Sequence, residues 1–469
     1  MTALHLFRQC GEHFVFHAGM GRFVRITPEA YDYLELRGAM PPEEAARRFS
    51  ADHPGAESVL ADVAALEADG FFEPVETLMP DDAEFESALD ERFSGPCNSI
   101  VLSVSTGCNL ACRYCYCGIC RDILPDKGMM PEDVALRAVD TLFAAADPKV
   151  NVRVTFFGGE PLLNKSVIRK VVAVCDAKAD RLGVRTEYSI TTNATLVDDE
   201  TAEMLSAGNF GLMVSMDGPQ DLHDSQCPTR DGHGSFELVA AGVRRIMAHR
   251  DKVTVRCTMA HPAPDAMRLI RFFADFGFSR VVLGTVRNPA FPSACDFTAE
   301  DSAAFDRAME REIIPWMLEE HAAGRTPIYD PFDDISAFHG AAGNPSKAEL
   351  RCGACHGSCA VAPDGTLYPC HRFVGMKAWA LGDISEGFPD ARGREFWRAW
   401  RAAVREKCSG CWALGVCGGP CPWEVARADG TFAPPDELLC EETRSWAQQG
   451  AYYFHKVGES DRNKGENKT

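Results

Sequence analysis

The sequence predicts an α/β protein built around a curved, partial (β/α)6 barrel, with a small unit before the barrel and a cysteine-rich unit after it. Six strand-like runs recur along the middle of the chain, and amphipathic helical segments follow all but the last. A hairpin pattern precedes this section, and a crowd of cysteines follows it. Because alternating strands and helices favour a parallel sheet with crossover helices, a barrel is the expected centre of the fold.

Residues 1–75 predict a winged-helix-like unit. His13–Phe16 and Arg22–Ile26 flank a glycine-containing turn, which is a hairpin signal. Thr27-Pro28 and Pro41-Pro42 open two helices, and apolar residues at helical spacing mark a third, because a capping residue or an early proline favours a helix start. Strands followed by helices in so short a segment indicate a module separate from the barrel.

The barrel is expected over residues 97–330, after an acidic stretch at residues 76–96 that predicts a solvated linker or a short exposed helix. Its strand-like runs are Ser99–Val104, Val150–Phe157, Glu187–Thr191, Gly211–Ser215, Lys252–Thr258 and Arg280–Thr285. Chemistry is expected at the carboxyl ends of these strands, where barrel enzymes place their active sites.

The alternation stops after the barrel. Residues 331–455 predict short β segments, turns and cysteine ligands, and the polar residues 456–469 predict a disordered tail.

Composition narrows the functional class. Lys and Arg total 48 against 68 Asp and Glu, and this net charge of −20 disfavours nucleic acid as a partner, since phosphate contacts need a basic face. No apolar run is long enough to cross a membrane. The first residues lack the pattern of a secretory signal, so a reducing, cytoplasmic location is expected and the 20 cysteines are not expected to form a disulfide framework.

A first group of cysteines follows the first strand directly. Cys108, Cys112 and Cys115 are spaced C-x3-C-x2-C, and three thiolates can hold a 4Fe-4S cluster whose remaining iron stays open to a small molecule. A zinc site with Cys117 or Cys120 as the fourth ligand is the alternative. These two cysteines also fit structural, spare-ligand or redox roles.

With its tyrosine before the third cysteine, this loop resembles that of the radical SAM superfamily. Gly158-Gly159-Glu160-Pro161, Thr191–Asn193 and Ser215–Pro219 follow later strands and resemble further motifs of that family. The resemblance implies that the open iron chelates the amine and carboxylate of S-adenosylmethionine, which is cleaved to a 5′-deoxyadenosyl radical. The cofactor contacts that it implies are Gly158, Gly159, Glu160, Pro161, Thr192, Asn193 and Ser215.

A second group of cysteines lies in the last quarter of the chain. Four of them, from Cys408 to Cys421, are spaced C-x2-C-x5-C-x3-C and are followed by Cys440, and Cys352-x12-Gly365-x4-Cys370 precedes them. This pattern resembles the SPASM extension of radical SAM maturases, and the resemblance implies two auxiliary 4Fe-4S clusters, three clusters in all. By this resemblance the outer cluster is held by Cys408, Cys411, Cys417 and Cys440. The inner one is held by Cys352, Cys370 and Cys421, together with Cys355 or Cys359. An auxiliary cluster with an open iron that takes a substrate thiolate, and a pair of structural zinc sites, are the alternatives.

Further resemblances indicate the substrate class. SPASM enzymes modify ribosomally made peptides and proteins, and residues 1–75 resemble their recognition domain, which binds a leader segment as an added strand. Phe14–Phe16 or Phe23–Ile26 would be the receiving edge. Pro369–Gly375 and Ser215–Pro219 with His223-Asp224 are similar to thioether-forming maturases, including those acting on Cys-rich peptides and on the small subunit of quinohaemoprotein amine dehydrogenase.

This similarity implies an enzyme that joins a Cys sulfur to a carbon, such as an Asp or Glu methylene, in a small Cys-rich protein or peptide. A reduced flavodoxin- or ferredoxin-type protein would supply electrons. Asp217 is the candidate base for the substrate thiol, and capping of the turn that follows it is the structural alternative. A sulfatase-type maturase that forms formylglycine and a zinc-stabilised scaffold without catalysis are the competing functions.

Overall fold

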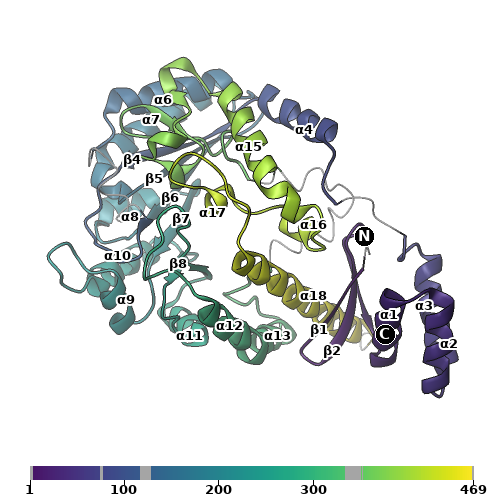
Figure 1. Ribbon diagram of the computed structural model, residues 1–469. Coiled ribbons are helices and arrows are strands. Elements are labelled where there is room, and N and C mark those ends of the chain that lie inside the picture. The colour runs from purple at the N-terminus through teal and green to yellow at the C-terminus, as the bar shows by residue number, and fades with distance from the viewer. Residues whose placement is uncertain (1–3, 74–77, 117–127, 333–349, 351, 467–469) are drawn as a thin grey trace.

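A nine-stranded sheet forms the centre of the protein in the computed structural model, which describes residues 4–73, 78–116, 128–332, 350 and 352–466, with side chains as far as residue 460. The strand order is β12-β11-β10-β4-β5-β6-β7-β8-β9, and β4 to β9 run parallel as a curved half-barrel (Figure 1). The six barrel strands confirm the predicted positions to within two residues. They are β4 (Ser99–Ser105), β5 (Val152–Gly158), β6 (Thr186–Thr192), β7 (Phe210–Ser215), β8 (Thr254–Met259) and β9 (Arg280–Thr285).

Helices cover the outer face of the barrel, where alternate strand residues such as Val154, Val214 and Val255 are fully buried. These helices are α6 (Glu132–Ala145), α7 (Lys165–Leu182), α8 (Asp199–Leu205), α9 (Gln220–Gln226), α10 (Phe236–Met247) and α11 (Ala266–Phe276). The expectation that no helix follows the last strand is wrong, because α12 (Ala299–Ala308), η3 (Met309–Ile313) and α13 (Ile314–Ala322) do so. Thr298 and Asp301 form a capping box that starts α12.

The C-terminal unit continues the barrel sheet. β10 (Ala360–Val361) pairs in parallel with β4, and β11 (Thr366–Tyr368) and β12 (Gly382–Asp383) add antiparallel strands. The 3-10 turn η5 (His371–Phe373) follows β11 directly. The shared sheet therefore joins the cysteine-rich unit to the first barrel strand. The other short turns of the protein are η2 (Pro161–Asn164), η6 (Lys377–Trp379), η7 (Ile384–Glu386), α16 (Leu414–Cys417) and α17 (Pro422–Val425).

Two long helices of the C-terminal unit escape the sequence prediction. α15 (Asp390–Cys408) buries Trp397 and Trp400, and α18 (Glu437–Glu466) runs from the cysteine-rich unit to the N-terminal sheet (Figure 1). The predicted disordered tail is wrong as far as Glu466, because α18 continues to that residue. Lys456 makes an ion pair with Glu12 of the N-terminal unit, which holds this part of the helix against that unit, and a second pair with Glu459 lies within the helix.

The N-terminal unit is a three-stranded antiparallel sheet followed by three helices. β1 (Leu4–Gln9), β2 (Glu12–His17) and β3 (Arg22–Ile26) pair in the order β1-β2-β3 and precede α1 (Pro28–Ala39), α2 (Pro42–Asp52) and α3 (Ala56–Ala68). The predicted hairpin and the Thr27 cap of α1 are confirmed. Because β2 is the central strand, the suggestion that Phe14–Phe16 forms the edge is wrong, and Phe23–Ile26 lies in the edge strand β3.

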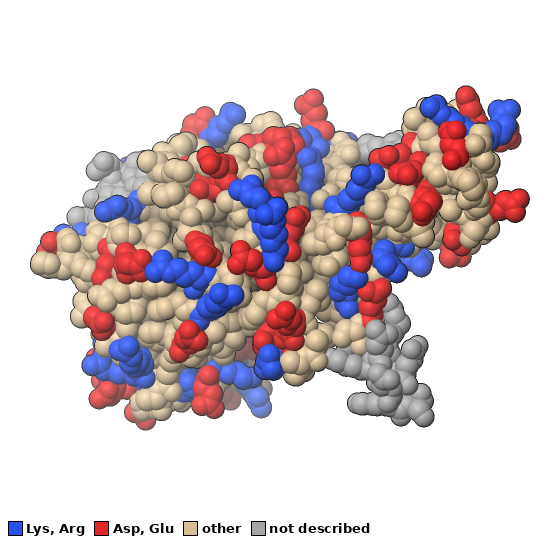
Figure 2. Space-filling view, turned by 90° about the horizontal axis from the view of Figure 1, so that it is seen from below, with Lys and Arg blue, Asp and Glu red and all other residues tan. Residues whose placement is uncertain are grey.

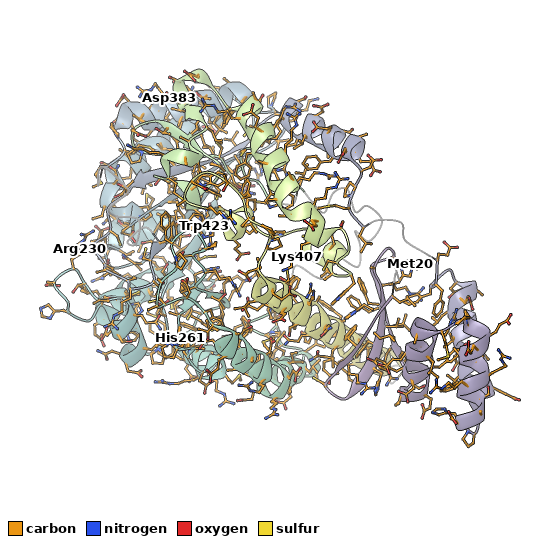
Figure 3. All side chains as sticks on the ribbon, viewed as in Figure 1. Met20, Arg230, His261, Asp383, Lys407 and Trp423 are labelled. Atoms are coloured by element: carbon orange, nitrogen blue, oxygen red, sulfur yellow. The ribbon has the colours of Figure 1, made fainter. Side chains whose placement is uncertain are left out.

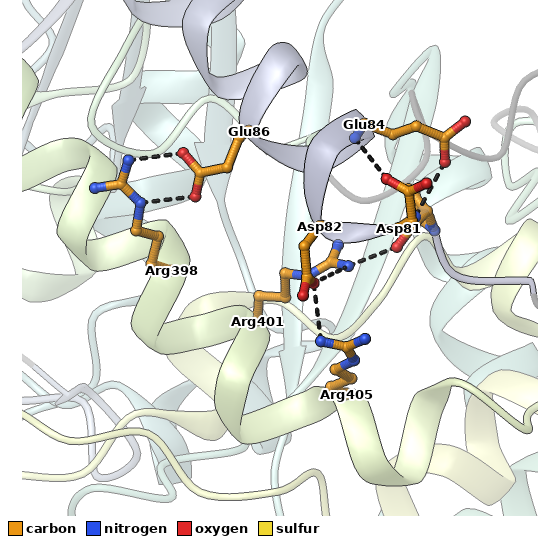
Figure 4. Close-up of polar contacts among 8 residues, drawn as sticks. Asp81, Asp82, Glu84, Glu86, Arg398, Arg401 and Arg405 are labelled. Carbon is orange, nitrogen blue, oxygen red and sulfur yellow. Dashed lines mark hydrogen bonds and ion pairs between the residues drawn. The ribbon is translucent and has the colours of Figure 1, made fainter.

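The acidic stretch before the barrel is a packed helix and not a solvated linker. α4 (Asp82–Ser94) buries Phe85, Leu89 and Phe93, and a capping box of Asp81 and Glu84 starts it. Its acidic side chains face arginines of α15 (Figure 4), with Glu86 paired to Arg398 at 2.7 Å and Asp82 paired to Arg405 at 2.8 Å. The charge that suggested solvation is thus matched by opposite charge on a helix more than 300 residues later.

The surface carries both signs of charge, and acidic and basic side chains are interspersed on the face shown in Figure 2. Among the described helices, none combines the length and apolar character that crossing a membrane requires. All 18 described cysteines are free of disulfides.

Candidate functional site

The loop carrying Cys108, Cys112 and Cys115 leaves the carboxyl end of β4 and is fixed to the segment after α9. Backbone N–H groups of Ala111 and Arg113 donate to the carbonyls of Pro228 and Gln226 at 2.8 and 2.9 Å. Burial raises the pKa of the Cys108 thiol to about 12, and the nearby Cys112 and Cys115 add to the rise. Three half-buried sulfur donors on one loop suit an iron–sulfur cluster, since ligation stabilises the thiolate form.

Gly158 and Gly159 let the end of β5 lie directly against this loop. The Gly159 N–H donates to the Ser105 carbonyl at 2.7 Å, and the Glu160 N–H donates to the Gly107 carbonyl at 2.9 Å. A Cβ atom on Gly158 would collide with the Ser105 carbonyl oxygen, and one on Gly159 would collide with the Gly107 carbonyl oxygen. Two glycines are needed here because the backbones of two strand ends meet.

Glu160 lies buried between the ends of β5 and β6, and Pro161 after it starts the short turn η2. Its carboxylate accepts hydrogen bonds from the Leu162 N–H (2.9 Å), the Thr192 hydroxyl (2.7 Å) and the Asn193 N–H (2.8 Å). Burial raises the pKa of Glu160 to about 6 despite these three donors. The Asn193 side chain donates to Asn109 Oδ1 at 3.0 Å, so the predicted cofactor-binding residues of β5 and β6 meet beside the cysteine loop.

Asp217 is buried just beyond the end of β7, after the half-buried Ser215. Its Oδ2 accepts hydrogen bonds from the Tyr114 hydroxyl (2.7 Å) and the Cys227 thiol (3.2 Å), and its Oδ1 accepts from the Thr258 N–H (2.9 Å). These contacts reach the cysteine loop and β8, which differs from the local turn cap considered as the alternative. The carboxylate already accepts a hydrogen bond from a thiol, which is the contact a base for a substrate thiol needs.

The cysteines expected to hold the outer auxiliary cluster share one cavity. Cys408, Cys411, Cys417 and Cys440 line a space of about 820 Å³ between α15, α16 and α18, with Cys421 at its wall. Lys407, labelled in Figure 3, lies on its rim and pairs with Glu437 at 2.8 Å. A single cavity bordered by five thiols provides both the donors and the room that a cluster requires.

The inner group of cysteines lies nearer the barrel. Burial raises the pKa of Cys370 to about 12, and Cys421 and Cys352 add to the rise. Burial also raises the pKa of Cys355 well above its usual range, with contributions from Cys359, then Cys370 and Cys352. Burial likewise raises the pKa of Cys359, and Cys370 adds to the rise. Both candidates for the fourth ligand therefore lie near Cys370.

Cys359 differs from its neighbour Cys355. Its thiol is fully buried and donates to the Tyr368 carbonyl at 3.3 Å, within the β10–β11 pair. Cys355 has a left-handed backbone (φ 63°), and its N–H donates to the Pro369 carbonyl at 2.9 Å. The geometry thus favours Cys355 as the fourth inner ligand, a choice that the sequence left open. Cys117 and Cys120 lie outside the described residues.

Trp423 of α17 connects this unit with the barrel opening (Figure 3). Its Nε1 donates to the Arg287 carbonyl after β9 at 3.4 Å, and its ring lies 5.6 Å from that of Tyr116. Two arginines lie near the same opening. Arg256 was not singled out from the sequence, and Arg372 entered only as part of the Pro369–Gly375 motif. A charged residue at an inward-facing position of the β8 alternation was the signal for Arg256.

Comparison with known proteins gives one family and two kinds of neighbour. A model of the Radical SAM superfamily matches residues 102–283, from β4 to β9. The serine-type anaerobic sulfatase-maturating enzyme of Bacteroides thetaiotaomicron is 30% identical over 385 residues, 77% of this chain and 91% of that protein. The cysteine-type enzyme of Clostridium perfringens is 24% identical over 334 residues, 70% of this chain and 89% of that protein.

Solved structures share the fold. The structure of anSMEcpe with bound AdoMet and Cp18Cys peptide has a TM-score of 0.63 at 19% identity, covering 78% of this chain and 99% of that one. Streptococcus suis SuiB bound to precursor peptide SuiA has a TM-score of 0.54 at 14% identity, and this match covers 93% of this chain and 98% of that one. The likeness to SuiB thus extends over a larger share of the present chain.

Proposed function

Because this chain belongs to the radical SAM superfamily, we propose that it is a maturase that joins a Cys sulfur to a carbon atom of a peptide or small protein. The observation that carries the proposal is the N-terminal unit, a sheet with a free edge attached to a radical SAM barrel. The fold likeness to SuiB, whose structure holds a precursor peptide, covers 93% of this chain, whereas the likeness to anSMEcpe covers 78%.

The receiving surface is a groove of about 500 Å³ between the edge strand β3 and helix α3. Val24 and Ile26 of β3 line one side, and Asp62, Ala65 and Leu66 of α3 line the other. An edge strand offers unpaired backbone groups, and a peptide that adds as a fourth strand satisfies them while its side chains enter the groove. We infer that the substrate is held there by a segment distant from the reacting residues.

The residues at the carboxyl ends of the barrel strands fit the cofactor. Cys108, Cys112 and Cys115 would hold the first cluster, and Glu160, Thr192, Asn193 and Ser215 border the space beside it. When bound, S-adenosylmethionine and its cluster supply a carbon radical that removes a hydrogen atom from the substrate. The glycine pair Gly158-Gly159 keeps the cysteine loop against β5, and a cofactor held by this loop would be shielded from bulk water by the barrel.

Asp217 is the proposed base. The substrate thiol gives its proton to this carboxylate, the carbon gives up a hydrogen atom, and the sulfur bonds to that carbon. The crosslinked product lacks two hydrogens, and an auxiliary cluster held by the C-terminal cysteines would accept the electron that is released as the bond forms. This released electron offsets the electron that starts the reaction. A reduced flavodoxin- or ferredoxin-type donor would supply that first electron. The two groups of C-terminal cysteines would hold the electron acceptors.

The experiment is co-expression with the small Cys-rich proteins encoded beside its gene, followed by mass spectrometry. The expected product has lost the mass of two hydrogens per crosslink and no longer reacts with a thiol reagent at those cysteines. Retention of every reactive thiol in all candidates would contradict the proposal.

A sulfatase-type maturase is the second candidate, because two relatives that cover most of this chain carry that name. Formylglycine formation from Cys replaces the side-chain sulfur with an aldehyde oxygen. The same spectra therefore separate the candidates, since an aldehyde reacts with a hydrazide reagent and a thioether does not.

A further inference from the structure

Two arginines face the barrel opening from different units of the chain. Arg256 lies on β8 opposite Ser215 of β7, with its side chain on the inner face of the sheet. Its guanidinium extends over Gly284 of β9, so closely that a Cβ atom at Gly284 would overlap it. The absence of a side chain at Gly284 therefore makes room for Arg256 inside the barrel.

Arg372 approaches from the cysteine-rich unit. It lies in η5, next to His371, whose ring is 4.2 Å from that of Phe157 on β5. Burial, then the charges of Arg372 and Arg256, lower the pKa of His371, so both guanidinium groups lie near this imidazole. Burial, then Arg372, also lowers the pKa of Arg256, whereas Tyr114 and Asp217 oppose the shift. The two guanidinium groups thus lie close together beside Asp217 and the cysteine loop.

Neither guanidinium is directly paired. Among the residues that the structure describes, neither has a hydrogen-bond acceptor or a carboxylate within ion-pair distance. Asp217 acts on Arg256, and the buried Glu424 acts on Arg372, through space and without a direct ion pair. A half-buried guanidinium without a direct ion pair keeps its hydrogen-bond donors available to a bound anion.

We propose that Arg256 and Arg372 form a subsite for the carboxylate of an acidic residue in the peptide substrate. This inference rests on the proposed function. A planar carboxylate suits the fork of a guanidinium, and Asp and Glu supply the anionic side chains of an unmodified peptide. The subsite lies between Asp217 on the barrel side and Cys370 with Cys421 on the auxiliary side. An acidic residue held there is within the space where the radical and the auxiliary clusters act.

The test is calorimetric titration of the cluster-loaded, S-adenosylmethionine-bound protein with two acetylated and amidated peptides, Cys-Gly-Gly-Glu and Cys-Gly-Gly-Gln. The blocked ends remove every carboxylate except that of Glu. We expect the Glu peptide to bind about tenfold more tightly, and we expect Arg256→Gln and Arg372→Gln each to remove the preference. Gly284→Ala should weaken it too, because it displaces the Arg256 guanidinium while keeping its charge. Arg268→Gln is the matched control, since this exposed arginine is paired with Asp221 at 2.9 Å.

Equal binding of the two peptides, or binding of neither, overturns the inference. Loss of S-adenosylmethionine binding in Arg256→Gln with the Glu preference intact would assign the pair to the cofactor carboxylate and overturn it as well. Loss of iron in Arg372→Gln with the preference intact would make that arginine a counter-charge for the cluster. Failure of the proposed function would give a different result. If the protein prefers the Glu peptide but crosslinks no Cys-rich protein, the carboxylate subsite stands and the thioether-forming function is wrong.

Discussion

The Tyr114 hydroxyl donates a hydrogen bond of 2.7 Å to Asp217 Oδ2, which ties the cysteine loop after β4 to the end of β7. The same oxygen accepts a hydrogen bond from the Cys227 thiol at 3.2 Å. One carboxylate therefore both positions the cysteine loop and is able to accept a proton from a thiol.

Asp217→Asn should lower crosslink formation at least about a hundredfold if the carboxylate takes the substrate proton. Tyr114→Phe removes one hydrogen bond and keeps the base, so a loss of at most about tenfold is expected. Product mass and 5′-deoxyadenosine yield, measured together on proteins of equal iron content, check both values. An equal loss in the two variants would indicate that Asp217 acts through Tyr114 only.

Gly159→Ala should prevent assembly of the first cluster, since the added methyl group collides with the Gly107 carbonyl and contacts Cys108. Iron per chain is expected to fall from about twelve to about eight. Gly208→Ala is the control, because a Cβ atom there meets nothing within 4 Å. Iron per chain is measured after anaerobic purification. A value of about twelve in Gly159→Ala would mean that the loop does not pack on β5 as described.

Cys355→Ser should cost the inner auxiliary cluster, with a loss of about four irons, whereas Cys359→Ser should keep it. The serine hydroxyl at position 359 can replace the thiol as donor to the Tyr368 carbonyl, so folding is preserved. Iron and sulfide analysis with electron paramagnetic resonance distinguishes the variants. The reverse pattern would exchange the two assignments.

Ala65→Trp should block substrate docking, because this exposed residue of α3 lines the groove beside β3. Ala64→Trp is the matched control on the same helix, since Ala64 is exposed and does not border the groove. We expect at least a tenfold rise in the Kd of a substrate for the first variant and no change for the second, roughly 1.4 kcal/mol of binding free energy. Binding titrations with a substrate found by co-expression test this difference.

The lowered pKa of His5 predicts that the stability of the folded protein depends on pH. Burial, then the charge of Arg444, lowers the pKa of His5 from 6.5 to about 4, and its ring stacks on Trp412 at 3.9 Å. Because the folded state favours the neutral ring, the contribution of His5 to the free energy of unfolding is complete above pH 6.5. It is lost as the pH falls toward 4. Between pH 7.5 and 5.5 the wild type should lose about 1 kcal/mol of unfolding free energy more than His5→Phe. Urea denaturation at both pH values measures it, and parallel curves would contradict it.

The barrel was predictable because its strands are short apolar runs and its motifs follow strand ends at fixed places. Gly158-Gly159-Glu160 and Thr192-Asn193 meet in space for that reason, since the carboxyl ends of neighbouring parallel strands are adjacent. The helix α18 and the packing of α4, which was expected as a linker or an exposed helix, were missed because their surfaces are charged and their partners are distant in sequence. Asp82 pairs with Arg405, and Lys456 with Glu12, contacts that no local pattern reveals.

Arg256 and Arg372 illustrate the same limit. Neither residue shows in its own segment that it lies near the other, because one belongs to a barrel strand and the other to a turn more than a hundred residues later. The choice between Cys355 and Cys359 likewise depends on the fold, because the Cys359 thiol donates a hydrogen bond to the Tyr368 carbonyl beside the β10–β11 pair.

Helix α18 carries Cys440 near one end and Lys456, the partner of Glu12, nearer the other. Sixteen residues of α-helix span about 24 Å, so a rigid rod sets the separation between the outer cluster and the recognition sheet. A substrate fixed at β3 must cross a constant distance to reach the barrel. The enzyme would then select residues for modification by how many positions separate them from the docked segment, as well as by their chemistry.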